Sequence, residues 1–440
     1  MRSPGSGRKL ICIRIQDFSM TMIHRMLALA AMLFALVSAP ANAQDVPPPR
    51  LSLLQAVTLA LGDAPEMTAA QARVESRRHL IDAGARRPNP TLDFSSEGVL
   101  GTGDHNLLNE GEAAVGIMQP LERGGDLVAR RTFAERDRDV AVVTAELRRR
   151  DLIQTVELAY LEVQAAIARA RVAEERVIAL AELAEVVDRR VRAARDPVMT
   201  RDRIEARLAE ARIEADLAQR RVVSDTMALA SYWGGTSDFT VDADGFYEVP
   251  ISTSQTQAGD TPELALLRAQ RARSDAEIGM ETARAVPDAN VGLEVRHYQS
   301  SNDVALGVRF SIPLQVWNSN RSNIASARAE TAAIDADFTA RQRQTQRDIQ
   351  RLQLHREGAA AELGSLDSAV LPRLQSSLEQ ARTGFARGNF SFLEIHDVQR
   401  ALIDAQLRRV DAIQSVHQSD IQLRRLGELD QIVPQGPGAR

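Results

Sequence analysis

The 440-residue sequence predicts an α+β fold in which long antiparallel α-helical coiled-coil hairpins are joined to four β-strands per chain. Three observations predict this fold. Apolar residues recur at alternating spacings of four and three over six heptads, which is typical of a coiled coil. Short runs alternate apolar and polar residues with the period of a β-strand. The same order of elements occurs twice along the chain, which indicates an internal repeat.

The first 43 residues have the pattern of a secretory signal. Residues 26–37 are apolar and uncharged but too few to span a bilayer as a helix. Ala41 and Ala43 supply the small residues of a cleavage site. We therefore expect residues 1–43 to be a signal peptide, with a buried N-terminal helix as the alternative. The one cysteine, Cys12, lies in this segment, so the mature chain should contain neither an intramolecular disulfide nor a cysteine-rich metal site.

Two copies of one ancestral unit account for the length better than unrelated domains do. The copies are expected at 51–235 and 262–428, separated by a connector at 236–261 that is rich in Gly, Ser, Thr, Asp and Pro. A flexible tail should follow at 429–440. The two copies open with the sequences Pro65-Glu66-Met67 and Pro262-Glu263-Leu264, and their strand pairs end in Pro120-Leu121 and Pro313-Leu314.

The first copy should contain a very long helix from about 126 to 194. At 1.5 Å per residue this helix would be roughly 100 Å long, which is too long for a compact domain. The turn at Pro197 folds it against a helix at 201–233, so the whole hairpin spans 126–233. Its seam is rich in Ala, which allows two helix axes to approach closely. The seam residues of the first helix are Leu152, Val156, Ala159, Val163, Ala166, Ala170, Ala173, Val177, Leu180, Ala184, Val187, Val191 and Ala194, and those of the second are Ile204, Leu208, Ala211, Ala215, Ala218 and Val222.

The second copy repeats the hairpin over 320–428. Its helices are expected at about 320–386 and 391–428, with a short break at the glycine of Arg387-Gly388-Asn389. Pro372 lies inside the first of these helices and should kink or split it, because proline cannot donate the helical hydrogen bond.

Strands are expected at 91–97 and 112–119 in the first copy and at 290–298 and 303–312 in the second. In the second pair one face is aliphatic and the other is small or charged; in the first pair the alternation is weaker. Nine or ten residues suffice for a tilted strand to cross a bilayer. Half-buried hairpins of a soluble protein have the same period. We favour the membrane because the chain carries an export signal and offers these hairpins no other core to cover.

No segment after the signal contains 18 uncharged apolar residues in a row, so a membrane-spanning part would have to be a β-barrel. Four strands cannot close a barrel around a wide lumen. Three copies of the chain would supply a 12-stranded β-barrel and, from four long helices each, a 12-helix tube.

At this point the sequence resembles the TolC family of outer membrane efflux proteins over about 51 to 428. The resemblance depends on an ordered set of features that occurs twice, and no single motif is specific. It includes the Pro-Glu openings, both Pro-Leu strand ends, Gly388 followed by Asp397-Val398-Gln399-Arg400, and a closing Leu-Gly. The short connector and the sequence Arg87-Pro88-Asn89-Pro90 resemble those of the metal-resistance branch, whose members serve cobalt–zinc–cadmium or copper–silver pumps.

The resemblance implies a homotrimer in the outer membrane of a Gram-negative cell, with its helical tunnel in the periplasm. Such a trimer would passively conduct substrates, heavy-metal cations first among them, from an inner-membrane resistance-nodulation-division pump and a periplasmic adaptor (membrane fusion) protein to the exterior. Many relatives are acylated on an N-terminal cysteine. This chain has none after the signal, so its barrel alone would hold it in outer membrane lipid.

The sequence offers no chemistry for an enzyme. It contains no nucleophile–base set, phosphate loop or Walker pattern, and its seven histidines are scattered without metal-binding helical spacing. We expect no catalytic residue, no cofactor and no bound metal. The net charge of −5 argues against a general nucleic-acid partner.

The helical turns of the two hairpins are the candidate site. Glu394 and Asp397 are spaced i,i+3 and share a helix face, so a trimer would present up to six carboxylates that favour cations. The simpler interpretation is that these two carboxylates only form a solvated acidic face and select nothing. The resemblance supports the selective reading, because relatives carry acidic residues at both positions. It also implies that Asp202 helps to hold the entrance closed and that Phe385 replaces an aromatic gating residue.

The same turns should dock the adaptor. Gly388 permits a backbone conformation that a side chain would hinder. Phe390 occupies a position where some relatives carry a basic residue, so a salt-bridged latch is not expected there. The docking residues are expected to be Asp196, Pro197, Val198, Gly388, Asn389 and Phe390.

Three other functions are compatible with parts of the sequence. A multidrug or organic-compound duct would have the same fold. A periplasmic coiled-coil adaptor should show one hairpin inserted in β domains, whereas two strand-pair and hairpin units occur here. A structural coiled-coil protein would not need the alternating strand from Val304 to Ile312.

Overall fold

The computed structural model describes residues 50–100, 111–249 and 261–427. They belong to one compact unit that begins at Arg50. The predicted signal at 1–43, the predicted tail at 429–440 and part of the predicted connector lie outside the described residues. Among the described residues, no helix is long and apolar enough to span a bilayer.

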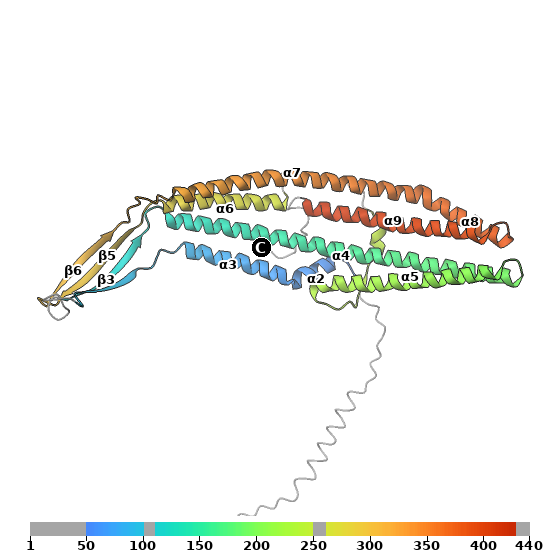
Figure 1. The fold of residues 1–440 in the computed structure, drawn as a ribbon, viewed down its shortest axis with the longest axis horizontal. Helices are drawn as coiled ribbons and strands as arrows, with labels where there is room; N and C mark the ends of the chain where they lie inside the picture. Colours follow the sequence, from blue (N-terminus) through green and yellow to red (C-terminus); the bar gives the residue numbers. More distant parts are fainter. Residues whose placement is uncertain (1–49, 101–110, 250–260, 428–440) are drawn as a thin grey trace, which may run out of the picture. The chain divides into compact units, whose positions relative to one another are not determined.

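The predicted fold class is confirmed: long antiparallel helical hairpins are joined to four strands, and the order of elements occurs twice (Figure 1). The first set comprises α2 (Leu53–Asp63), α3 (Pro65–Gly84), β2 (Thr91–Glu97), β3 (Glu112–Leu121), α4 (Asp126–Arg192) and α5 (Val198–Ala230). The second comprises α6 (Pro262–Arg284), β5 (Ala289–Tyr298), β6 (Asp303–Ser311), α7 (Arg321–Ser365), α8 (Leu371–Arg387) and α9 (Phe392–Leu426).

Short elements precede the first set and connect it to the second. The strand β1 (Arg50–Leu51) pairs in parallel with β4 (Thr240–Val241), and two short helices, η1 (Ser231–Trp233) and η2 (Asp244–Tyr247), flank β4. Phe246 of η2 is fully buried between α4 and α9, where it joins a core with Leu161, Val410 and Ile413. The described part of the connector is therefore packed against the helices.

Helix α4 is the helix that the others pack against. It has 67 residues, so it is roughly 100 Å long. It contacts α2, α3, α5, α6 and α9. Its predicted seam is buried at Val156, Val163, Leu180 and Val187. Tyr160 packs beside this seam in the cluster shared with α2. A second buried face carries Leu161, Ala165, Ala168 and Val172, which pack in the cluster shared with α9.

The helix predicted at 320–386 is split, as Pro372 required. Helix α7 ends at Ser365, a single π-helical turn follows over Leu366–Val370, and α8 begins at Leu371 with Pro372 in its first turn. A proline ring has no N–H to donate and crowds the preceding turn, so the chain widens there. One arm of the second hairpin therefore consists of α7 and α8, and the other arm is α9.

The four longer strands form one antiparallel sheet in the order β2-β3-β5-β6. The register aligns apolar residues of all four strands in rows on one face, and all of them are exposed in the single chain. The rows are Leu92–Ile117–Leu293–Val308 and Phe94–Val115–Val295–Leu306. The weak alternation of the first strand pair is therefore sufficient to continue the apolar face of the second.

The opposite face of the sheet is polar. Glu294 makes ion pairs with Arg296, at 3.1 Å, and with Arg309. Gly116 and Gly307 lie beside Glu294 on the neighbouring strands. A Cβ atom at Gly116 would lie 3.1 Å from the Cβ of Glu294, so the glycines leave room for the charged side chain.

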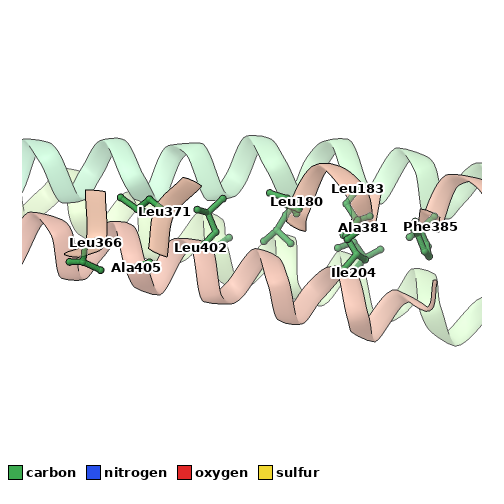
Figure 2. Packing of buried hydrophobic residues seen from close by; sticks show 13 residues of the cluster. Leu180, Leu183, Ile204, Leu366, Leu371, Ala381, Phe385, Leu402 and Ala405 are labelled. Atoms are coloured by element: carbon green, nitrogen blue, oxygen red, sulfur yellow. The ribbon is translucent and has the colours of Figure 1, made fainter. Parts of the chain in front are cut away.

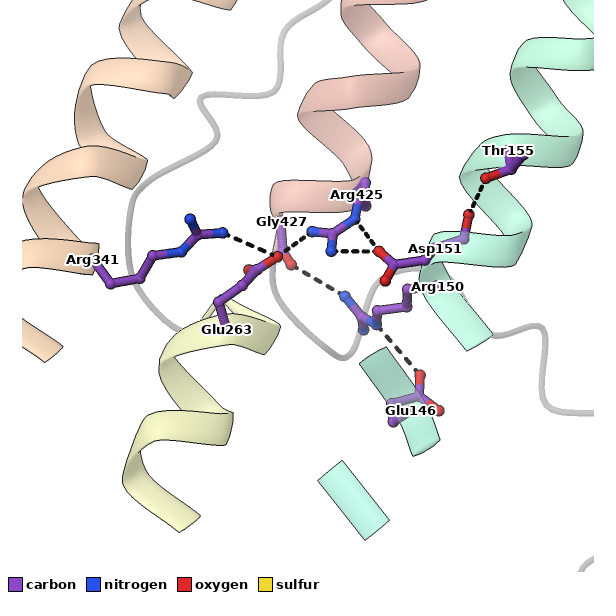
Figure 3. A network of polar contacts seen from close by, with 8 residues as sticks. All are labelled: Glu146, Arg150, Asp151, Thr155, Glu263, Arg341, Arg425 and Gly427. Atoms are coloured by element: carbon purple, nitrogen blue, oxygen red, sulfur yellow. Dashed lines mark hydrogen bonds and ion pairs between the residues drawn. The ribbon is translucent and has the colours of Figure 1, made fainter. Parts of the chain in front are cut away.

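A buried ionic network joins the two halves near the middle of α4 (Figure 3). Arg425 of α9 donates from Nε to Asp151 of α4 at 2.7 Å and also pairs with Glu263 of α6. Arg341 of α7 lies 3.6 Å from the same Glu263 carboxylate. Arg425 and Glu263 are only 14% and 12% exposed, so removal of one partner would leave a buried charge uncompensated.

Truncation of Phe246 should destabilise the fold strongly. Phe246→Ala removes a fully buried ring, and a change of this kind lowers the free energy of unfolding by about 3–5 kcal/mol. Urea-induced loss of helical circular dichroism measures it. The control is Leu54→Ala, because Leu54 is 65% exposed on α2 and should change the free energy by no more than about 0.5 kcal/mol. Equal midpoints for the two variants would contradict the packing described for η2.

Candidate functional site at the hairpin turns

The turns of the two hairpins lie at the ends of the helices that are remote from the sheet (Figure 1). The α4–α5 turn contains Ala194, which adopts a positive φ of 53°. The α8–α9 turn contains Gly388 at φ 87°, where a left-handed residue ends the helix. There the amide of Asn389 donates to the Gly384 carbonyl at 2.8 Å, and the amide of Gly388 donates to Phe385 at 3.0 Å. Both turns therefore have fixed backbone shapes.

Arg190 of α4 ties the two turns together. Its Nε and Nη2 atoms donate to the two carboxylate oxygens of Asp196 at 2.7 and 2.9 Å. Its Nη1 atom donates to the carbonyl of Phe385 on α8 at 2.5 Å. The guanidinium carbon also lies 4.6 Å from the centroid of the Phe385 ring, in cation–π contact.

The Arg190–Asp196 pair is largely shielded, with side-chain exposures of 13% and 15%. The hydrogen bonds from Arg190 lower the pKa of Asp196, and those to Asp196 raise the pKa of Arg190. Both groups therefore stay charged at neutral pH. Asp196, predicted to be a docking residue, thus acts inside the turn, and Arg190 was not singled out from the sequence. The local sign of this ion pair in the sequence is an arginine, Arg190, six residues before an aspartate, Asp196, at the predicted turn.

Phe385 lies in the core between the hairpins and is 1% exposed. It packs in a cluster with residues such as Leu183, Ile204 and Ala381 from α4, α5 and α8 (Figure 2). The resemblance implied a gating aromatic at this position. In this conformation the ring joins the two hairpins and faces no opening, so a gating role stays a prediction.

Exposed apolar side chains cover both turns. Val198 and Met199 begin α5 and are 56% and 57% exposed; Phe390 and Leu393, around the start of α9, are 42% and 63% exposed. The Phe390 ring lies over Gly384, where an added Cβ would come within 2.2 Å of a ring carbon. Gly384 therefore fixes where Phe390 lies. Exposed apolar side chains gathered at both tips fit a protein-docking surface better than a solvated turn.

Glu394 has a structural task in addition to its charge. Its Oε2 atom accepts hydrogen bonds from the Ser391 amide at 2.6 Å and from the Ser391 hydroxyl at 2.8 Å, which closes a capping box at the start of α9. These bonds lower the pKa of Glu394. The Ser391-x-x-Glu394 spacing in the sequence is the signal that could have revealed this cap.

Asp397 and Asp202 are exposed, as is Glu394, so all three carboxyl groups predicted at the turns reach solvent in the single chain. Glu394 and Asp397 lie in the first two turns of α9, and Asp202 lies in the first turns of α5. Within the described residues, no group of three His, Cys, Asp or Glu side chains is arranged to hold a metal ion. The site can therefore present carboxylates to a passing cation, with no metal-ligand cluster in the described part of one chain.

The family profile described as "Outer membrane efflux protein" matches residues 56–235 and 254–427. The cobalt-zinc-cadmium resistance protein CzcC of Cupriavidus metallidurans is 27% identical over 381 residues, covering 86% of this chain and 90% of that protein. The nickel-cobalt-cadmium resistance protein NccC of Alcaligenes xylosoxydans xylosoxydans is 26% identical over 307 residues, covering 68% of this chain and 69% of that protein.

Two solved structures share the fold. CusC, described in work on folding and transmembrane channel formation, superimposes with a TM-score of 0.71 at 16% identity and covers 85% of this chain and 92% of its own. The outer membrane protein VceC of Vibrio cholerae also has a TM-score of 0.71 at 16% identity, with coverages of 85% and 96%.

Loss of Arg190 should loosen both turns. Arg190→Gln removes the bidentate pair with Asp196 and the bond to the Phe385 carbonyl, so amide hydrogen exchange around 194–196 and 388–390 should accelerate roughly tenfold or more. Mass spectrometry of the exchanged protein measures this. The control is Arg192→Gln, because Arg192 is 77% exposed and pairs with Asp188 on its own helix. Unchanged exchange at the α8–α9 turn in Arg190→Gln would contradict the tie.

Proposed function

Because the chain belongs to the outer membrane efflux protein family, we propose that it is the outer-membrane channel of a tripartite efflux system that passively conducts heavy-metal cations out of the cell. One structural observation carries this proposal. A sheet with two exposed rows of apolar side chains on one face is followed in the chain by long helices, of which α4 is roughly 100 Å long. The apolar face suits the membrane, and the helices suit a passage through the periplasm. This role needs no catalysis.

Three copies of the chain form the channel in this proposal. In the described residues, β2 and β6 each pair on one side only, and such edges are prone to pair with another chain. Three sheets joined edge to edge give twelve strands, and closure removes every edge. In the same assembly α3 and α7, the outermost helices beside the sheet, meet the neighbouring copies.

Support for a metal cargo comes from the relatives and from the turns. CzcC and NccC are described as resistance proteins for cobalt, zinc, cadmium and nickel. In a trimer, Glu394 and Asp397 provide rings of carboxylates near the helical entrance, and charged rings of this sign favour cations. Organic compounds are the alternative cargo; the names of the relatives favour metals.

The partners in the proposal are a periplasmic adaptor and an inner-membrane resistance-nodulation-division pump. The exposed apolar residues Val198, Met199, Phe390 and Leu393 give the adaptor a surface to dock on. The Arg190–Asp196 pair holds both turns in a fixed shape for docking. Selection among metals would then be made mainly by the pump.

Deletion of the gene should sensitise the cell to cobalt, zinc, cadmium or nickel, because the channel completes their export. The measurement is the minimal inhibitory concentration of each metal and of a panel of drugs. A deletion strain that carries the wild-type gene on a plasmid is the control. Sensitivity to drugs alone would replace the metal cargo with organic compounds, and no sensitivity to either would contradict the proposal.

Neutralisation of the entrance carboxylates should lower cation preference. Glu394→Gln with Asp397→Asn removes both charges, and Gln at position 394 preserves the capping box. The ratio of cation to anion permeability in a planar bilayer should fall about twofold or more. The control pair is Glu379→Gln with Glu330→Gln, which removes two exposed charges elsewhere on α8 and α7. If both double variants kept the wild-type ratio, the turns would not set selectivity.

A further inference from the structure

We propose that residues 313–318, between β6 and α7, form a membrane-interface anchor that places Trp317, Val316 and Leu314 at the headgroup boundary of a phospholipid leaflet. This inference rests on the proposed function, because it requires the sheet to lie in a bilayer. It adds a second contact with lipid to that of the sheet face, at the helical end of the sheet.

The anchor residues are among the most exposed apolar side chains of the described chain. Trp317 is 95% exposed, Leu314 is 83% exposed and Val316 is 68% exposed. Three apolar side chains within four positions, left in water, carry a hydrophobic cost that burial would remove. Trp combines a large apolar ring with one N–H donor, and it concentrates at membrane–water boundaries for that reason.

The segment is fastened at its end and does not simply hang free. The side chain of Asn318 accepts from the Asn320 amide at 3.1 Å. The Asn320 side chain donates to the carbonyl of Glu281 on α6 at 2.6 Å and to the Glu281 carboxylate at 2.9 Å. These bonds hold the start of α7 to α6. Trp317 is therefore presented outward from a fixed base, which reduces the entropy cost of its insertion.

The anchor continues the apolar face of the sheet. Phe310, near the end of β6, is 63% exposed, and Leu121, at the end of β3, is 46% exposed. The register places the end of β3 opposite the start of β5, and the start of β5 opposite the end of β6. Leu121 and Phe310 therefore lie at the same end of the sheet, near the helices. Exposed apolar side chains therefore lie both at this end of the sheet and in the 313–318 segment that follows β6.

Two exposed arginines lie at the same end of the sheet. Arg123 follows β3 and Arg321 begins α7; within the described ranges, neither guanidinium pairs with a carboxylate. Of the acids nearby, Glu122 pairs with Arg130 and Glu281 with Arg284, whereas the Asp288 carboxylate accepts a hydrogen bond from the Arg123 amide at 3.2 Å. Guanidinium groups bind phosphate in bidentate fashion. Apolar side chains beside free arginines fit phospholipid headgroups above acyl chains.

A second copy of the chain fits this segment less well. If β6 pairs with β2 of a neighbour, the segment would lie near the residues that precede β2. In this chain those residues, 86–90, are all exposed and comprise two arginines, an asparagine and two prolines. They offer no apolar pocket for an indole ring. We therefore assign the anchor to lipid, and contact with a neighbouring copy becomes an outcome of the test.

Tryptophan fluorescence tests the anchor directly, because the chain contains two tryptophans. Trp233 packs near Phe239, with ring centroids 5.7 Å apart, so Trp233→Phe is a conservative change that leaves Trp317 as the sole reporter. The full-length channel is reconstituted into vesicles of phosphatidylcholine and phosphatidylglycerol. Quenching is compared for lipids brominated at shallow and at deep acyl positions and for aqueous iodide.

Trp317 should be quenched by brominated lipid, about twofold more by the shallow than by the deep position, and weakly by iodide. Protection from both quenchers would place the ring against a second copy and overturn the inference. Quenching by iodide alone would place it in water and also overturn it. A reporter at the sheet face, Phe310→Trp in the background Trp233→Phe with Trp317→Phe, should be quenched more deeply than Trp317.

Failure of the anchor and failure of the proposed channel function give different results. A variant Trp233→Phe channel that conducts ions while Trp317 escapes lipid quenching sinks only the anchor. A reconstituted protein in which neither reporter is quenched by lipid and no conductance appears would contradict the proposed function itself. Growth on metals provides an independent check that Trp233→Phe leaves the channel active in cells.

Discussion

The packing of α4 is the constraint on which the rest of the structure depends. This helix is buried on two faces at once, one toward α5 and one toward α9 and the connector. Alanine at seam positions such as Ala166 and Ala170 lets the neighbouring axes come close, so helices can be arranged side by side in a curved wall. Because α4 extends from the sheet to the turns, its packing sets how far apart the membrane contact and the entrance lie.

Two polar networks at different points along α4 join separate parts of the chain. Near its middle, Arg425 and Glu263 share a buried ionic network with Asp151 that joins the two halves of the chain. At the turns, Arg190 makes bonds to Asp196 and Phe385 that join the two hairpins. Arg425, Glu263, Arg190 and Asp196 are largely shielded and paired, so removal of one partner would leave a buried charge uncompensated. The side chains left exposed at the turns and at the sheet are then free to contact partners, cargo or lipid.

Much of the fold could be predicted from local pattern. The seam of α4, the split at Pro372 and the alternation of β5 and β6 are periodic features that neighbouring residues determine together. The nonlocal contacts could not be predicted. Arg190 meets Phe385 across 195 positions, and only the folded hairpins bring them together. The burial of Phe385 was equally out of reach, since an aromatic at a helix end has the same local pattern whether it faces a lumen or a core. The cap made by Glu394 is local, and the Ser391-x-x-Glu394 spacing suffices to predict it.

The central claim is that three copies of this chain enclose one conduit. Single-particle imaging of the detergent-purified full-length protein tests it most directly. The account predicts a three-fold particle in which β6 of each copy pairs with β2 of the next, with an open passage along the α4 helices. A monomer, a two-fold particle, or a three-fold particle without a continuous passage would contradict it.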